Sequence, residues 1–158
     1  MKAADIESVL IDKPAENQEN LKYLIDLMNR VASENLGFTL GTWQSRDESE
    51  APITTIEQLI ASGRQACVGG WLAVSPIWKD QGGSVDLGTG GPVCLKFPVR
   101  VQPIDAVAEW LGVSRDMAAM IMGFRGFDDG ETFSLFYGKE FQDIGAADVA
   151  LKLQELIA

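Results

Sequence analysis

Residues 16–35 read ENQENLKYLIDLMNRVASEN, and this stretch decides the fold class. Its apolar residues recur at the spacing of a helix with 3.6 residues per turn, so they share one face while the charged residues share the other. The apolar face consists of Leu21, Leu24, Ile25, Met28, Val31 and Ala32. The pattern predicts an amphipathic helix over residues 17–35, with Gly37 as its stop.

The same spacing predicts further helices along the chain. We expect them near residues 54–62, 66–75, 103–111, 114–122 and 146–157. Capping signals support two of these helices. Thr54 or Thr55 precedes the first and Gly63 follows it, while Ser114 and Gly123 bound the helix at 114–122.

The core and the β portion complete the predicted architecture. Pro76 limits the length of the helix at 66–75, and the glycine-rich stretch 80–92 favours short β-elements joined by turns. Residues 93–101 alternate enough for a strand, which Pro98 either restricts to an edge or ends. The predicted core includes Trp71, Leu72, Trp110, Leu111 and Ile121. We therefore expect a mainly α fold with a small β portion (α+β). It should be a compact single domain over residues 1–158, with about six helices plus a short hairpin or edge strands.

The composition is that of a globular protein. The chain has 158 residues, of which 46% are hydrophobic, and it is long enough to bury a core without disulfides or metal. No apolar run approaches the ~20 residues that a membrane span requires, and no secretory signal is visible at the N-terminus. We expect a cytoplasmic protein without membrane association, located in the host cytoplasm if a phage encodes it.

The residue types present exclude several classes of active site. The sequence contains no histidine, which rules out Ser-His-Asp and Cys-His catalysis and every histidine-liganded metal site. Cys67 and Cys94 are expected to be small buried thiols. Asp105 and Glu109 could form an acid/base pair, but carboxylates at that helical spacing usually face solvent. We predict no catalytic residue, no cofactor and no metal, and therefore no enzyme.

The charge points to a basic protein partner. The formal net charge is −10, from 23 acids and 13 bases, and the excess is spread over both halves of the chain. Such a field repels nucleic acid and anionic membranes and attracts basic proteins, although solubility alone would also explain it. The candidate partner-binding residues lie in two polar segments: Asp47, Glu48, Glu50, Asp128, Asp129 and Glu131.

Residues 106–123 read AVAEWLGVSRDMAAMIMG and resemble a DNA-binding helix-turn-helix signature. Reading DNA requires polar and basic side chains on the exposed face of the second helix. Here that helix offers Met117, Ala119, Met120 and Met122. Such a helix favours core packing, or a groove for a partner helix, over binding in a DNA groove.

Three segments carry a family resemblance. QACVGGW (65–71) contains Cys-x-x-Gly-Trp, AVAEWLGV (106–113) contains Ala-x-x-Leu-Gly, and residues 38–43 read Phe-x-x-Gly-x-Trp. Over roughly residues 20–125 the chain resembles a loosely defined set of small uncharacterised phage and bacterial proteins with these helices. It departs from them at residues 62–64, where a cysteine and a threonine often stand. The resemblance implies origin and architecture but no activity.

Together these observations favour a non-catalytic phage or prophage accessory protein that binds a host protein. In one version of this hypothesis, its acidic surface is a decoy for a basic nucleic-acid-handling protein. The first alternative is a small-molecule-binding protein or small enzyme with a pocket beside the glycine-rich segment. The second alternative is a helix-turn-helix DNA-binding protein.

Overall fold

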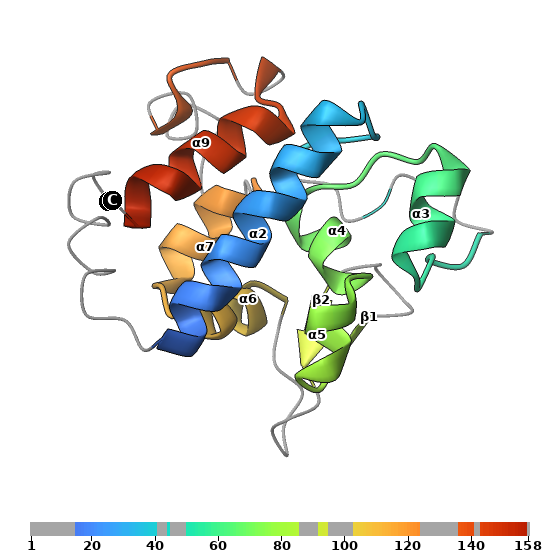
Figure 1. Ribbon diagram of the computed structural model, residues 1–158, viewed down its shortest axis with the longest axis horizontal. Coiled ribbons are helices and arrows are strands. Elements are labelled where there is room, and N and C mark those ends of the chain that lie inside the picture. Colours follow the sequence, from blue (N-terminus) through green and yellow to red (C-terminus); the bar gives the residue numbers. More distant parts are fainter. Residues whose placement is uncertain are drawn as a thin grey trace.

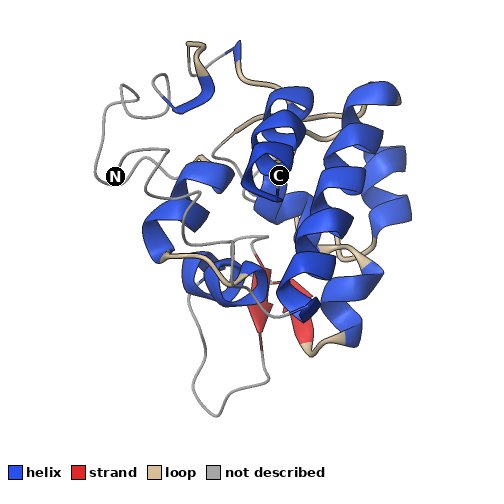
Figure 2. Cartoon of the chain, turned by 60° about the vertical axis from the view of Figure 1, so that its left-hand side comes forward, coloured by secondary structure: helices blue, strands red, loops and turns tan. Residues whose placement is uncertain are grey.

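The computed structural model describes residues 15–40, 44, 50–85, 92–94, 103–123, 136–140 and 143–157. Within these ranges the chain is mainly helical with a small β portion, which confirms the predicted fold class (Figures 1 and 2). The helices are α2 (Ala15–Ser33), α3 (Ile56–Ser62), α4 (Val68–Ala73), α5 (Pro76–Asp80), α6 (Pro103–Leu111), α7 (Arg115–Met122) and α9 (Ala146–Ile157). The strands are β1 (Gly83–Val85) and β2 (Pro92–Cys94).

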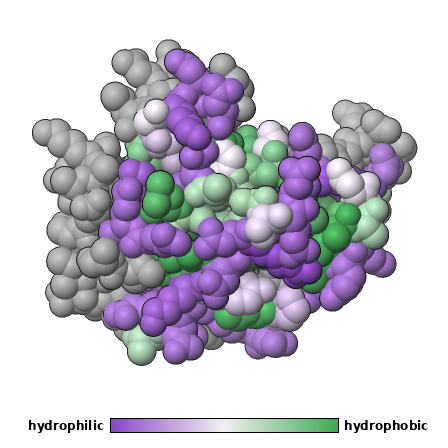
Figure 3. All heavy atoms as spheres, turned by 45° about the horizontal axis from the view of Figure 1, so that its top comes forward, coloured by the Kyte–Doolittle hydropathy of each residue, from purple (hydrophilic) through white to green (hydrophobic). Residues whose placement is uncertain are grey.

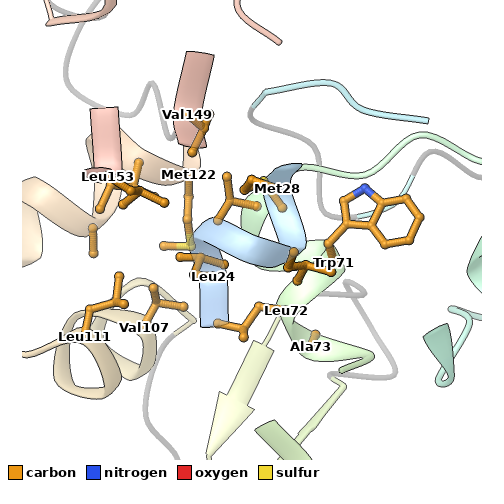
Figure 4. Packing of buried hydrophobic residues seen from close by; sticks show 14 of the residues in the cluster. Leu24, Met28, Trp71, Leu72, Ala73, Val107, Leu111, Met122, Val149 and Leu153 are labelled. Atoms are coloured by element: carbon orange, nitrogen blue, oxygen red, sulfur yellow. The ribbon is translucent and has the colours of Figure 1, made fainter. Parts of the chain in front are cut away.

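Helix α2 organises the core. It packs most extensively against α9 and also contacts α6 (Figure 1). Leu24 and Met28, both fully buried, lie among labelled side chains of α4, α6, α7 and α9 (Figure 4). The buried hydrophobic residues form one cluster. All five predicted core residues belong to it: Trp71, Leu72, Trp110, Leu111 and Ile121.

The end of α2 differs from the prediction. The helix stops at Ser33, and Asn35 adopts a left-handed conformation with a φ of 53°. The Leu36 N–H then donates to the carbonyl of Val31 at 2.9 Å, which closes the helix end. Asn35 thus performs the role predicted for Gly37. Gly37 is required for another reason, because a β-carbon there would collide with the backbone carbonyl oxygen of Arg64.

The helix predicted over residues 66–75 is shorter, and a separate helix follows it. Helix α4 ends at Ala73, and Ser75 is extended with a φ of −78° and a ψ of 142°. Pro76 then occupies the first turn of α5. A proline excludes the preceding residue from helical geometry, yet its fixed φ suits the start of a helix. The proline therefore separates two helices, and α5 is a short helix that the sequence pattern did not predict.

The predicted caps of α3 and α7 are confirmed. Thr55 and Ser114 each accept a hydrogen bond from the backbone N–H three residues later. Gly63 and Gly123 follow the last turns with φ values of 69° and 77°. These left-handed positions suit glycine, which lacks the β-carbon that would clash there.

The β portion is an antiparallel pair in which Gly83 faces Cys94 and Val85 faces Pro92. The Trp78 indole N–H donates to the Ser84 carbonyl at 3.1 Å and fixes the pair against α5. A β-carbon at Gly83 would overlap the Trp78 ring, so this contact requires glycine. The remainder of the strand predicted over residues 93–101 lies outside the described residues.

Residues 136–140 are a short described segment that lies between α7 and α9 in the sequence. The Tyr137 hydroxyl lies 3.3 Å from the Met120 carbonyl and 3.4 Å from that of Ile121, two acceptors in the last turn of α7. The Lys139 ammonium lies 2.9 Å from an oxygen of Asp148 in α9. Burial raises the pKa of Tyr137, and the carboxylate of Asp148 raises it further.

We therefore predict that Tyr137 makes the fold sensitive to alkali. Above pH ~10 the unfolded chain releases the phenolic proton while the folded protein retains it, so the free energy of unfolding falls by up to about 1.4 kcal/mol per pH unit. Tyr137→Phe lacks this dependence. Urea unfolding at pH values from about 9 to about 11 should show the stability advantage of the wild type over this variant shrinking. If the difference in free energy of unfolding between the wild type and Tyr137→Phe stays constant over this pH range, the pKa of Tyr137 is not raised in the folded protein.

Candidate functional site: an acidic groove between α2 and α5

An open groove of about 610 Å³ lies between the exposed face of α2 and α5. Its α2 wall includes Glu16, Glu19, Lys22, Tyr23 and Asp26, and its α5 side includes Ile77 and Gln81. We call it the acidic groove. Its volume is within the range of ligand-binding sites, but those sites are typically enclosed clefts or cavities. This openness suits a segment of another protein better than a small molecule.

The floor of the acidic groove is a polar network around the buried Asn20. Asn20 is 3% exposed, and its amide donates to the Trp110 carbonyl at 2.9 Å. The Gln81 amide donates to Asn20 Oδ1 at 3.1 Å, and the Trp110 indole N–H donates to Gln81 Oε1 at 3.0 Å. The Asn17 amide also donates to the Trp110 carbonyl, at 2.9 Å. The side chains of these four residues thus link α2, α6 and the end of α5.

Two tryptophans extend this network toward the hairpin. The Trp78 and Trp110 rings make an edge-to-face contact, with centroids 5.9 Å apart and planes at 73°. This geometry is favourable because the positive ring edge meets the negative ring face. Since Trp78 also binds the Ser84 carbonyl, the groove floor is continuous with β1.

The carboxylates of the groove are open to solvent. Glu16, Glu19 and Asp26 are exposed and form no ion pair with any described lysine or arginine. Lys22 lies between Glu19 and Asp26 at helical spacing, but it also makes no ion pair within the described ranges. The groove therefore carries two net negative charges, from three carboxylates and one ammonium.

The same imbalance holds across the described surface. Five ion pairs occupy five of its bases: Arg30–Glu34, Arg64–Glu50, Arg115–Asp105, Lys139–Asp148 and Lys152–Glu155. The exposed carboxylates left without a described ionic partner are Glu16, Glu19, Asp26, Glu57, Asp80, Glu109, Asp116, Glu140 and Asp143. In Figure 3 hydrophilic residues spread over the face shown and interrupt the hydrophobic ones.

Of the six predicted partner-binding residues, only Glu50 is described. It pairs with Arg64, which also donates to the Ala51 carbonyl at 3.4 Å, so Glu50 helps to fix the start of the segment before α3. The other five lie outside the described residues: Asp47, Glu48, Asp128, Asp129 and Glu131. The acidic groove contains none of the six, and its site residues were missed.

The structure also places the other residues that the sequence singled out. Asp105 pairs with Arg115 at 3.0 Å, and Glu109 is exposed. Cys67 is fully buried, as expected, and Cys94 lies in β2. Among the described histidine, cysteine and acidic residues, no group of three is placed to hold a metal ion.

The second helix of the helix-turn-helix-like pair faces the core. Met117, Ala119, Met120 and Met122 are all buried, with exposures of 0–4%. These side chains therefore present no surface to a DNA groove or to a partner helix. Ala108, also buried, accepts the Val113 N–H at 2.9 Å through its carbonyl and closes the turn. The motif describes how two helices pack, and its buried second helix gives no support to DNA binding.

A second open groove of about 470 Å³ lies where the end of α2 meets the start of α9. Its lining contains no charged residue. The Gly145 N–H at its edge donates to Asp148 Oδ2 at 2.9 Å, which satisfies one amide at the start of α9. This groove offers less specific recognition than the acidic groove.

No protein-family model, curated protein or solved structure matches the chain. Within the described ranges, none of the helices is long and apolar enough to cross a membrane. The surface chemistry of the described residues is what remains to indicate a function.

Proposed function

We propose that the chain is a non-catalytic accessory protein that acts by binding a basic protein. The observation that carries this proposal is the set of nine exposed carboxylates without a described ionic partner, against two described bases without one, Lys22 and Lys79. Such a surface has negative potential available for a partner.

The positions of two of these carboxylates support the proposal. Asp80 is the last residue of α5, and Glu109 lies in the last turn of α6. The C-terminal end of a helix already carries partial negative charge, so acidic side chains there do not stabilise the helix. Their placement is easier to explain by an interaction outside the fold. Both residues adjoin the polar network below the acidic groove, through Gln81 and Trp110.

The resemblance to small phage and bacterial proteins gives the proposal its biological setting. A phage or prophage protein of this kind would act in the host cytoplasm on a host protein. A basic nucleic-acid-handling protein is the partner that an acidic decoy surface would attract. The openness of both described grooves argues against the alternative of a small-molecule enzyme.

Capture from a bacterial lysate tests the proposal. The immobilised protein should retain one or more basic proteins at low ionic strength and release them as salt is raised, because salt screens exposed charges. An unrelated protein of similar net charge, immobilised in parallel, is the control for non-specific ion exchange. Retention of nothing beyond this control, or retention that ignores ionic strength, would contradict the proposal.

A further inference from the structure

We infer that the acidic groove is the docking site for an amphipathic, lysine- or arginine-bearing segment of the partner. This inference rests on the proposed function and adds the place and mode of binding. Glu16, Glu19 and Asp26 supply negative charge along the open side of the groove, and Ile77 and Tyr23 supply half-buried apolar surface within it.

The two kinds of surface match the two parts of a long basic side chain. Lysine and arginine lay their methylene stems along apolar surface while the charged head remains in water. In the acidic groove a stem would lie against Ile77 and Tyr23, and the head would reach the carboxylates of α2. A segment with apolar residues between its basic ones would also cover the rest of the apolar surface.

The groove is already shaped for such a segment. Its floor is held by the bonds among Asn20, Gln81 and Trp110, so binding does not require the helices to move. Gln81 uses one of its two amide N–H donors in this network. The second N–H can donate to a backbone carbonyl of a segment lying in the groove.

Lys22 makes the inference testable in both directions. Its ammonium is the cation among the groove-lining side chains, and it reduces the negative potential that a basic segment meets. Removing it should strengthen binding, whereas most surface substitutions weaken an interface or leave it unchanged. Lys79 is the matched control, because it is the other described base without an ion pair and its ammonium instead contacts the Thr54 carbonyl.

The experiment compares four variants for binding a synthetic peptide that mixes lysine and leucine. The groove variant carries Glu16→Gln, Glu19→Gln and Asp26→Asn. The distant variant carries Glu57→Gln, Asp116→Asn and Glu140→Gln, which removes the same charge. We expect the groove variant to bind about tenfold more weakly than wild type and the distant variant to change less than about twofold. Lys22→Gln should bind about threefold more tightly, and Lys79→Gln should match wild type.

Equal weakening of the groove and distant variants would overturn the inference, because binding would then follow the total charge. The proposed function would survive that result. If the lysate capture retains no basic protein beyond the control, the proposed function itself is contradicted. Amide and methyl chemical shifts locate the peptide independently of affinity, and we expect the largest shifts at Ile77, Tyr23 and the Gln81 side chain. Shifts confined to other surfaces, or spermine competing as strongly as the peptide, would overturn the docking of a segment.

Discussion

Replacing Trp71 by alanine is expected to lower the free energy of unfolding by about 3–5 kcal/mol. The side chain is completely buried in the cluster around α2, and its indole N–H donates to the Gly37 carbonyl at 2.9 Å. The same carbonyl accepts the Ala66 N–H at 3.3 Å. Trp71 therefore helps to hold the backbone at residue 37 against the backbone at residue 66. The substitution leaves a cavity and removes one of these bonds.

Urea unfolding followed by circular dichroism measures this effect. Trp71→Phe is the control, because it retains much of the buried volume and loses the indole hydrogen bond, and it should cost about 1–3 kcal/mol. If alanine at this position costs less than about 1 kcal/mol, Trp71 does not have the central packing role described above.

Replacing Asn20 by leucine is expected to cost about 1–3 kcal/mol, although leucine is apolar and similar in volume. The buried amide of Asn20 binds the Trp110 carbonyl and accepts the Gln81 amide, so its loss leaves a Gln81 N–H without its partner. The variant therefore loses two hydrogen bonds, and each contributes about 0.5–1.5 kcal/mol to stability. We also expect this variant to bind the lysine–leucine peptide more weakly than the wild type, because the Gln81 side chain is no longer held by its hydrogen bond to Asn20.

Asn29→Leu is the matched control for this substitution. Asn29 lies on the exposed face of the same helix, so the same chemical change should alter the free energy of unfolding by less than about 0.5 kcal/mol. Equal effects of the two substitutions in urea unfolding would show that helix propensity, rather than the polar network, determines the cost.

The amphipathic helices could be predicted because their signals are local. Residues 17–35 show a clear 3.6-residue period, and Thr55, Gly63, Ser114 and Gly123 are standard helix boundaries. The end of α2 was misplaced because asparagine also tolerates the left-handed conformation, as Asn35 does here. Local sequence does not determine which of two candidate residues adopts it.

The acidic groove could not be predicted, because it depends on contacts between distant segments. Asn20 and Trp110 are 90 positions apart, and Asn20 and Gln81 are 61 apart. The helix that forms the other wall was missed, since Pro76 was interpreted only as a limit on α4. One signal was present in the sequence: Asn17 and Asn20 continue the buried stripe of Leu24 and Met28. Polar residues on an apolar stripe indicate a buried hydrogen-bond network.

The salt dependence of binding tests directly whether this protein acts through its negatively charged surface. Calorimetry would measure the affinity of the wild-type protein for the lysine–leucine peptide over a series of salt concentrations. We predict measurable binding at low ionic strength and an affinity that falls steadily as salt screens the exposed carboxylates. Absence of binding at low ionic strength, or an affinity independent of salt, would show that the negatively charged surface does not mediate binding.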